Sequence, residues 1–210
     1  PTGRLNDVGA YTRVNVDRSH RIGLETSATV NPDERLSIEA SLTVSSNKIK
    51  AFNEYIDNWA TGEQEVVAWE NTDLAFSPDL LANLQAKYTI LSNLKYELSV
   101  DAGGRYVGKQ YADNTSREAS SLDPYIVTDA GVHWTWFRKE SKEVKVGLLL
   151  KNALNESYES NGWIYRFRSE GYDPTPDDPY AGSEGGGLYH QKGYFPQAGR
   201  YLLIQMSVSF

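Results

Sequence analysis

Two arginines in the last quarter of the chain are the residues best suited to bind a charged ligand. Arg166 and Arg168 are separated by one residue, so an extended segment would place both on one face. The planar guanidinium fork matches the geometry of carboxylate and phosphate groups. The pair is therefore a candidate clamp for an anionic ligand. The alternative is that the two arginines form ion pairs with Glu170 or Glu159.

Aromatic side chains are frequent among the polar residues of two long stretches, 47–78 and 152–198. Exposed rings are unfavourable unless they stack on a ligand or pack against neighbouring segments. The first possibility makes these stretches part of a binding surface, and the second makes them self-packed connections. Together with the two arginines, the candidate ligand-binding residues are Trp59, Trp69, Trp163, Tyr165, Arg166 and Arg168.

The residue pattern gives little support for metal binding, catalysis or nucleic-acid binding. Asp173, Asp177 and Asp178 do not have the spacing of an EF-hand loop, so we expect a solvated turn rather than a calcium site. The chain has no cysteine, and its three histidines lack ligand spacing. We therefore expect no metal site and no cofactor. No Gly-x-Ser-x-Gly elbow is present, so we expect no catalytic residues and no enzyme activity. The net charge of -7 argues against a nucleic-acid partner.

Strict alternation of apolar and polar residues predicts strands. No run approaches the 18 apolar residues of a membrane-spanning helix, but strands of 9–11 residues suit a tilted path across a bilayer. The segments that alternate are 21–30, 36–45, 80–90, 94–103, 126–136, 144–151 and 202–210. The sequence therefore predicts an all-β fold, a transmembrane antiparallel β-barrel. The residues expected to face lipid are Ile38, Ala40, Leu42, Leu84, Leu98, Val146, Leu148, Ile204 and Met206.

The connections between these strands alternate in length. Short turns are predicted at 32–35, 91–93 and 138–143, and long connections at 45–79, 106–124 and 152–198. Outer-membrane barrels have short periplasmic turns and long extracellular loops, whereas a β-sandwich has no reason to sort its loops in this way. We therefore expect the long connections outside the cell and the carboxyl terminus in the periplasm. Trp134, Trp136 and Tyr96 fall near the short turns, as in a periplasmic aromatic girdle, and Tyr106 and Tyr125 are weaker candidates for the outer girdle.

Seven is an odd number of strands, whereas bacterial barrels have even numbers and both termini in the periplasm. Counting back from a periplasmic carboxyl terminus places residues 1–10 outside the cell. We therefore expect residues 1–210 to be the carboxy-terminal portion of one larger barrel domain, with its earlier strands absent from this sequence.

Four short motifs resemble those of TonB-dependent outer-membrane receptors, particularly the Bacteroidetes type. They occur in the family's order and cover essentially the whole chain: residues 6–15 with 19–25, residues 74–78 with 82–84, residues 151–155 with Tyr158, and residues 194–200. The resemblance implies a 22-stranded barrel with an amino-terminal plug, of which this chain would be the last seven strands. The plug and its TonB box are absent from the sequence.

The resemblance also implies a function in the bacterial outer membrane, which is active import of a scarce ligand with TonB-derived energy. The cargo would be an iron chelate, or another cofactor or an oligomer. The implied partners are outer-membrane lipid, the rest of the barrel and its plug, the TonB complex through that plug, and the barrel-assembly machinery. By resemblance to outer-membrane barrels in general, Phe210 would be the assembly signal. The alternative is a structural or binding barrel subunit of an outer-membrane complex without transport, and an upstream plug with a TonB box would discriminate between the two.

Overall fold

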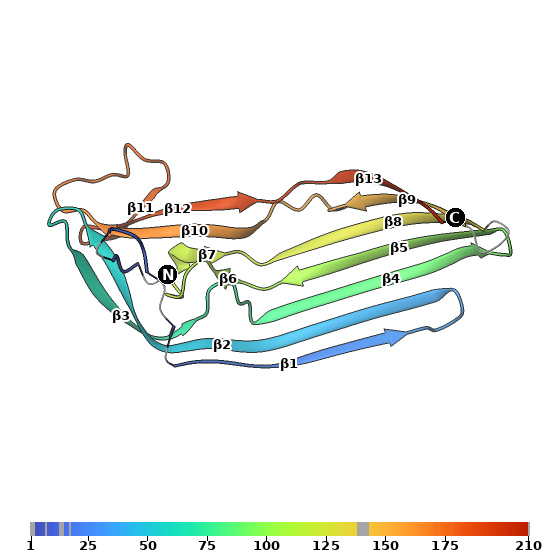
Figure 1. Cartoon of the computed structure of the whole chain (residues 1–210), viewed down its shortest axis with the longest axis horizontal. Helices are drawn as coiled ribbons and strands as arrows, with labels where there is room; N and C mark the ends of the chain where they lie inside the picture. The colour runs from blue at the N-terminus through green and yellow to red at the C-terminus, as the bar shows by residue number, and fades with distance from the viewer. Residues whose placement is uncertain (1–2, 7, 13–14, 17, 138–142, 210) are drawn as a thin grey trace.

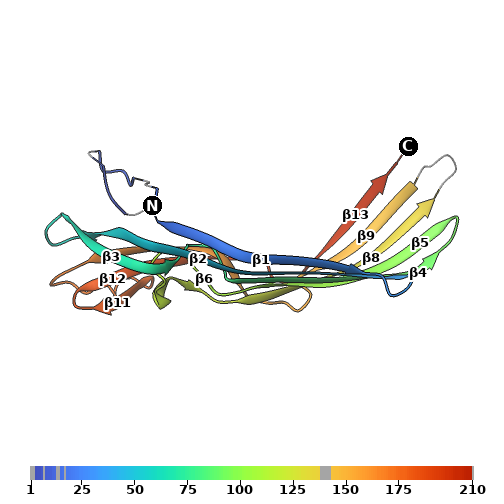
Figure 2. The same ribbon diagram turned by 90° about the horizontal axis from the view of Figure 1, so that it is seen from below.

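Seven long strands form an antiparallel up-and-down sheet in the computed structural model, which describes residues 3–6, 8–12, 15–16, 18–137 and 143–209 (Figure 1). Each strand pairs with the next of the seven along the chain, and the sheet is curled rather than flat (Figure 2). None of the described residues forms a helix that is long and apolar enough to span a membrane. The all-β prediction and its seven strands are confirmed: β1 (Ser19–Val30), β2 (Leu36–Asn58), β4 (Leu80–Ser92), β5 (Tyr96–Val107), β8 (Tyr125–Phe137), β9 (Glu143–Lys151) and β13 (Tyr201–Val208).

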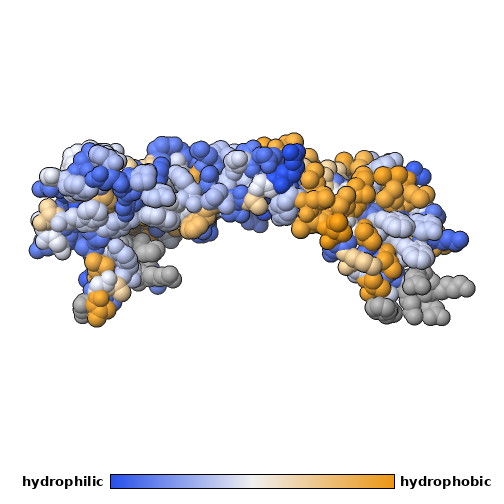
Figure 3. Space-filling model, turned by 90° about the horizontal axis from the view of Figure 1, so that it is seen from above, coloured by the Kyte–Doolittle hydropathy of each residue, from blue (hydrophilic) through white to orange (hydrophobic). Residues whose placement is uncertain are grey.

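The strand register aligns the apolar residues of all seven strands on one face. Leu42 lies opposite Thr26 on β1 and Ala82 on β4, and at the other edge Leu148 lies opposite Ile204. Directly opposed residues of an antiparallel pair project to the same face, so these residues form one continuous surface. That surface is exposed, with Ile204 77% accessible. Figure 3 shows hydrophobic side chains gathered over the half of the molecule that contains the short turns.

Asparagine and aspartate side chains close the two short turns that the structure describes. The Asp33 carboxylate accepts hydrogen bonds from the N–H groups of Arg35 (2.7 Å) and Leu36 (2.9 Å). The Asn93 side chain does the same for Lys95 and Tyr96 (2.8 and 3.0 Å). Local bonds of this kind favour turns over strands. The second turn lies at 93–95, two residues later than predicted, and residues 138–142 of the third predicted turn lie outside the described residues.

A register shift in β4 corrects the predicted face of one side chain. Simple alternation places Ile90 beside Tyr88 on the apolar face. The structure has an irregularity between Thr89 and Leu91, so Leu91 lies opposite Leu98 instead. An extra residue in one strand reverses the alternation beyond it, and a sequence pattern of period two cannot reveal this.

The long connections were predicted as loops, and this was wrong for much of their length. β2 continues to Asn58 and returns as β3 (Gln64–Asp73), and the stretch 152–198 contains β10 (Glu159–Arg168), β11 (Ala181–Gly185) and β12 (Leu188–Pro196). The stretch 106–124 holds the short strands β6 (Gln110–Tyr111) and β7 (Ser121–Leu122) and the 3-10 helix η1 (Glu118–Ser120). Both faces of these strands carry polar and aromatic side chains, so no apolar alternation marks them in the sequence.

These added elements form one body, here called the extension, which comprises residues 47–73, 108–124 and 159–196. β10 pairs antiparallel with β12 and runs parallel to the end of β2, where Phe167 lies opposite Asp57. The buried apolar side chains lie in the extension or at its base: Ile49, Ile56, Val107, Leu122, Tyr125, Phe167 and Tyr189. The molecule therefore has a soluble-type core at one end and outward apolar side chains at the other.

Two further expectations concern this end of the molecule. Tyr125 was assigned to an outer girdle, but it is 7% exposed and packs on Tyr158 with ring centroids 4.4 Å apart, so that assignment was wrong. The amino-terminal segment was expected to lie with the long connections, and it contacts the β2–β3 hairpin. The Leu5 N–H donates to the Gln64 side chain (3.1 Å), and the Tyr11 hydroxyl donates to Asp57 (3.2 Å).

Candidate functional site

A cavity of about 490 Å³ lies in the extension, between β2, β10 and residues 112–115. Six of its 17 lining residues are aromatic, and they include Phe52, Tyr55 and Phe76. Of the six candidate ligand-binding residues, Trp163, Tyr165 and Arg166 line this cavity, and Trp59, Trp69 and Arg168 do not. Sequence reasoning missed Phe76, which precedes β4 and has a left-handed backbone (φ 52°). A non-glycine residue in this conformation is strained, and such strain often marks functional positions.

Asp57 forms the polar corner of the cavity. Its carboxylate accepts hydrogen bonds from the Tyr165 hydroxyl (2.8 Å), the Tyr11 hydroxyl (3.2 Å) and the Gln64 side-chain amide (2.7 Å). Burial and the nearby Asp57 charge raise the pKa of Tyr165, so this hydroxyl remains protonated and keeps donating. Because the carboxylate already has these three donors, the cavity presents rings rather than a free charge.

Arg166 and Arg168 form ion pairs, the alternative that the sequence had left open, but with different acids from those expected. The Arg166 guanidinium donates to Glu54 (2.6 Å) and, through Nε and Nη2, to Glu184 (3.1 and 2.7 Å). Arg168 donates to Glu65 (2.8 Å) and to the Gly186 carbonyl oxygen (2.6 Å). Glu170 and Glu159 were proposed because they are near in sequence, whereas the observed acids come from other strands.

Glu184 is the centre of a charge network that braces one wall of the cavity. Its carboxylate also accepts from Arg117 and His190, the latter at 3.0 Å. Burial alone would raise the pKa of Glu184, but hydrogen bonds from Arg166 and the Arg117 charge lower it. Burial lowers the pKa of His190, although the Glu184 charge opposes this. The network joins β10, β11, β12 and the 106–124 connection, and nothing in the sequence around Glu184 or Arg117 indicates it.

The two tryptophans outside the cavity have packing roles. The Trp59 ring stacks on Phe167 with centroids 3.9 Å apart, and its indole N–H donates to the Tyr165 hydroxyl (3.3 Å). The Trp69 indole N–H donates to Glu54 (2.8 Å). Trp59 therefore packs on β10, and Trp69 is tied to β2.

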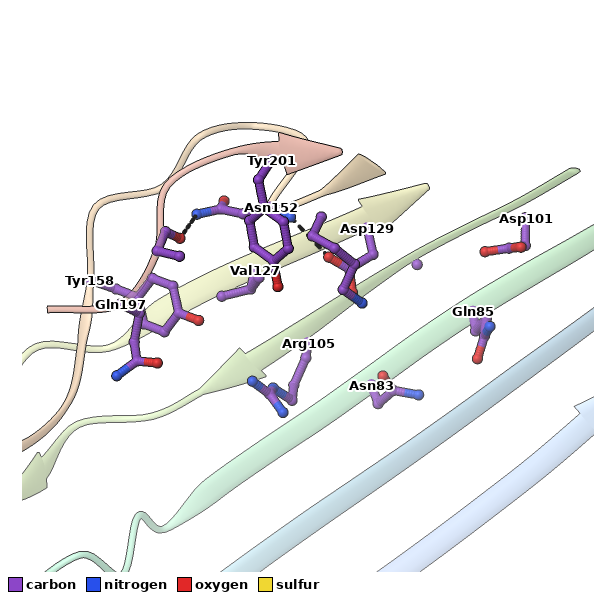
Figure 4. A pocket seen from close by; sticks show the side chains of 14 residues that line it. Asn83, Gln85, Asp101, Arg105, Val127, Asp129, Asn152, Tyr158, Gln197 and Tyr201 are labelled. Atoms are coloured by element: carbon purple, nitrogen blue, oxygen red, sulfur yellow. Dashed lines mark hydrogen bonds and ion pairs between the residues drawn. The ribbon is translucent and has the colours of Figure 1, made fainter. Parts of the chain in front are cut away.

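The sheet carries a second cavity of about 400 Å³ on the face opposite the apolar surface, close to the extension (Figure 4). Its lining is mostly polar and comes from β4, β5, β8, β9, β13 and the connection before β13, with Asn83, Arg105 and Asp129 among the residues. Lys151 forms an ion pair with Asp129. This polar wall is the predicted lumen face, and its charges are partly paired with one another.

Two of the motifs behind the family resemblance meet beside this polar wall. Asn152 adopts a left-handed backbone (φ 49°), and its N–H donates to Asp129 (2.9 Å) while its side-chain amide donates to the Glu156 and Ala198 carbonyl oxygens (2.8 and 3.1 Å) (Figure 4). The Arg200 N–H donates to the Asn155 side chain (2.9 Å). Asparagine tolerates this backbone conformation well and bonds locally. The motifs 151–155 and 194–200 therefore form one clasp between the end of β9 and the start of β13.

The acidic run of the 152–198 stretch makes local hydrogen bonds. Asp173 accepts from Thr175, Asp177 from the Tyr172 hydroxyl (2.9 Å), and Asp178 from Gln191 (2.5 Å). Over the described parts of the chain, the structure has no group of three His, Cys, Asp or Glu residues that could hold a metal ion. Phe210, the expected assembly signal, lies outside the described residues.

Comparison with known proteins gives one family. Residues 1–155 match a family model described as TonB dependent receptor-like, beta-barrel. No curated protein matches the chain.

Proposed function

Because the chain belongs to the family of TonB-dependent receptor-like β-barrels, we propose that it is part of a receptor that imports a scarce ligand with TonB-derived energy. Proteins of this family are outer-membrane transport receptors rather than enzymes. The observation that carries the proposal is the alignment of apolar residues across seven strands of a curled sheet. An exposed apolar face of this extent needs a lipid environment. The cargo would be an iron chelate, or another cofactor or an oligomer.

Residues 1–210 would form the carboxy-terminal portion of a larger barrel of 22 strands. Among the described residues, β1 pairs only with β2, and β13 pairs only with β9. A transmembrane sheet cannot leave such edges unpaired in lipid, because each unsatisfied backbone group is costly there. Further strands would pair with β1 and β13, and the polar wall around Asp129 would face the plug through which TonB acts.

The extension would project outside the cell, and the short turns and the carboxyl terminus would lie in the periplasm. This orientation follows the usual arrangement of outer-membrane barrels, with short turns on the periplasmic side. Phe210 would then be presented to the barrel-assembly machinery at the periplasmic end of the last strand.

The ring-lined cavity of the extension would receive part of the cargo. Its volume of about 490 Å³ is within the range of small-molecule pockets. Arg166 and Asp57 already have bonded partners, so the cavity suits an aromatic or apolar part of a ligand rather than a free anion. Trp163, which lines the cavity and is 45% exposed, is the ring most available for stacking. Trp59, Trp69 and Arg168 would support the site from outside the cavity.

The test measures uptake of radioactive iron, supplied as catecholate and hydroxamate chelates, by cells that produce the full-length receptor. We expect uptake that requires TonB, and an affinity about tenfold weaker for Trp163→Ala, as for a loss of more than about 1 kcal/mol at a binding hot spot. Tyr180→Ala is the matched control, because Tyr180 is an exposed ring of the extension that does not line this cavity. No TonB-dependent uptake of any tested chelate, oligosaccharide or cobalamin would favour a structural barrel. Equal effects of the two substitutions would reject the cavity as the binding site.

A further inference from the structure

A basic rim lies at the boundary between the apolar face and the extension. It consists of Arg18 and His20 beside or on β1, and of Lys48 and Lys50 on β2. His20 lies opposite Lys48, and the Lys50 N–H donates to the Arg18 carbonyl oxygen (2.8 Å), which continues the same register. Opposed residues share a face, and alternation places all four on the face of Ile22. The basic rim is therefore an outward surface that directly adjoins the apolar one.

The basic rim places like charges opposite each other. Arg18 and Lys50 face each other across the two strands, an arrangement that destabilises a sheet unless an anion compensates it. Lys48 has such an anion in Asp73. Arg18, His20 and Lys50 are exposed, and among the described residues none of them has an ion-pair partner. A shallow hollow of about 590 Å³ lies between them.

The position of the basic rim matches the headgroup layer of a membrane. His20 is two residues beyond Ile22, the last large apolar residue on this face of β1, and Arg18 is four residues beyond it. At about 3.3 Å per residue and a strand tilt of about 40°, these positions lie roughly 5 and 10 Å above the hydrocarbon. The headgroup region begins at the hydrocarbon edge and extends about 5–8 Å outward, so His20 lies within it and Arg18 lies within a side-chain length of its outer margin. Anionic groups of the lipid would therefore meet the uncompensated cations.

We propose that the basic rim binds the phosphate groups of a phosphorylated glycolipid in the outer leaflet. This inference rests on the proposed function, because it takes the extension to lie outside the cell. A phosphorylated lipid fits the two adjoining surfaces, because its phosphate groups complement the charge of the basic rim while its acyl chains contact the apolar face. Arginine and lysine near a membrane surface each add to the attraction of anionic lipid.

The experiment compares lipid binding by the purified full-length receptor with that of the double variant Arg18→Gln/Lys50→Gln. The probes are a diphosphorylated glucosamine-disaccharide lipid, its dephosphorylated form, and inorganic phosphate as competitor. We expect affinity for the phosphorylated lipid to fall about ten- to thirtyfold, as for about 1 kcal/mol per cation, with the dephosphorylated lipid unaffected. The matched control is Arg35→Gln/Lys95→Gln, which removes the same charge from exposed positions at the short turns.

Three results would overturn the proposal. They are unchanged affinity in the rim variant, an equal loss in the control variant, and displacement of the lipid by inorganic phosphate at equal concentration. The last would assign the rim to free anions. Iron-chelate uptake measured with the same proteins separates this proposal from the proposed function. Normal TonB-dependent uptake with unchanged lipid affinity rejects the glycolipid site alone, and absence of such uptake in the unmodified receptor rejects the transport function alone.

Discussion

Replacement of Leu42 by arginine tests whether the aligned apolar face contacts lipid. Leu42 lies opposite Thr26, which is midway between Ile22 and Val30 on β1. At about 3.3 Å per residue, the eight steps between those two residues span roughly 26 Å, or about 20 Å of height at a tilt of about 40°. Leu42 is therefore about 10 Å from either edge of the apolar band, close to the bilayer midplane.

An arginine at this depth should destabilise the barrel by about 2–4 kcal/mol, whereas one near the edge of the band costs about 0–1 kcal/mol. Ser41→Arg is the control at the same depth. Ser41 lies opposite Ser27 and Asn83 on the polar face, so its arginine would be solvated in the lumen. Val30→Arg supplies the edge position. The expected order of destabilisation is Leu42 first, with the two controls well below it.

The free energy of unfolding is measured by guanidinium titration of the full-length receptor in lipid vesicles, together with the yield of assembled protein in cells. Equal losses for Leu42→Arg and Ser41→Arg would show that the two faces have the same environment. That result would refute the membrane assignment of the sheet, because the register leaves no other difference between the two positions.

Four further predictions concern the extension, the clasp and the carboxyl terminus. Glu184→Gln should lower the free energy of unfolding of the extension by about 2–3 kcal/mol, because Arg166, Arg117 and His190 lose a shared charged acceptor. Limited proteolysis should then cleave the extension faster, and an unchanged cleavage rate would contradict the prediction. The pKa of His190 is lowered in the folded unmodified protein, so unfolding binds a proton once the pH falls below the ordinary value of 6.5. The extension should therefore become less stable as the pH falls, and amide hydrogen exchange in the extension should be faster at pH 5.5 than at pH 7.5 once the intrinsic exchange rates are corrected for pH. Asn152→Ala should lower the free energy of unfolding by about 2–4 kcal/mol, because it removes three side-chain hydrogen bonds and places alanine in a left-handed backbone conformation. Asn152→Gly also loses the hydrogen bonds but tolerates this backbone conformation, so it should be about 1 kcal/mol more stable than Asn152→Ala. Deletion of Phe210 should lower the amount of assembled receptor in pulse-chase heat-modifiability gels, and a normal rate and yield would reduce Phe210 to an ordinary interfacial residue.

Period-two alternation was sufficient to locate the seven long strands and their apolar face. In a barrel, lipid and lumen impose opposite polarities on alternate residues, so the environment is recorded in the local sequence. Residues such as Leu42 and Leu148 are therefore assigned to a face by their neighbours alone. The alternating lengths of the connections placed the short turns at one end by the same local logic.

Alternation could not predict the strands of the extension, because both faces of these strands carry polar and aromatic side chains. The cavity and its braces depend on contacts between residues far apart in the chain, as between Arg166 and Glu54, or Arg117 and Glu184. Arg166 is an example: its residue type suggested a clamp for an anionic ligand, but in the structure it forms ion pairs with acids on other strands. Pairing across strands also set the shift at Leu91 and brought Lys50 against Arg18. The sequence by itself therefore determined the membrane sheet, where each residue meets its own environment, whereas only the tertiary structure decided which side chains meet in the extension and at its rim.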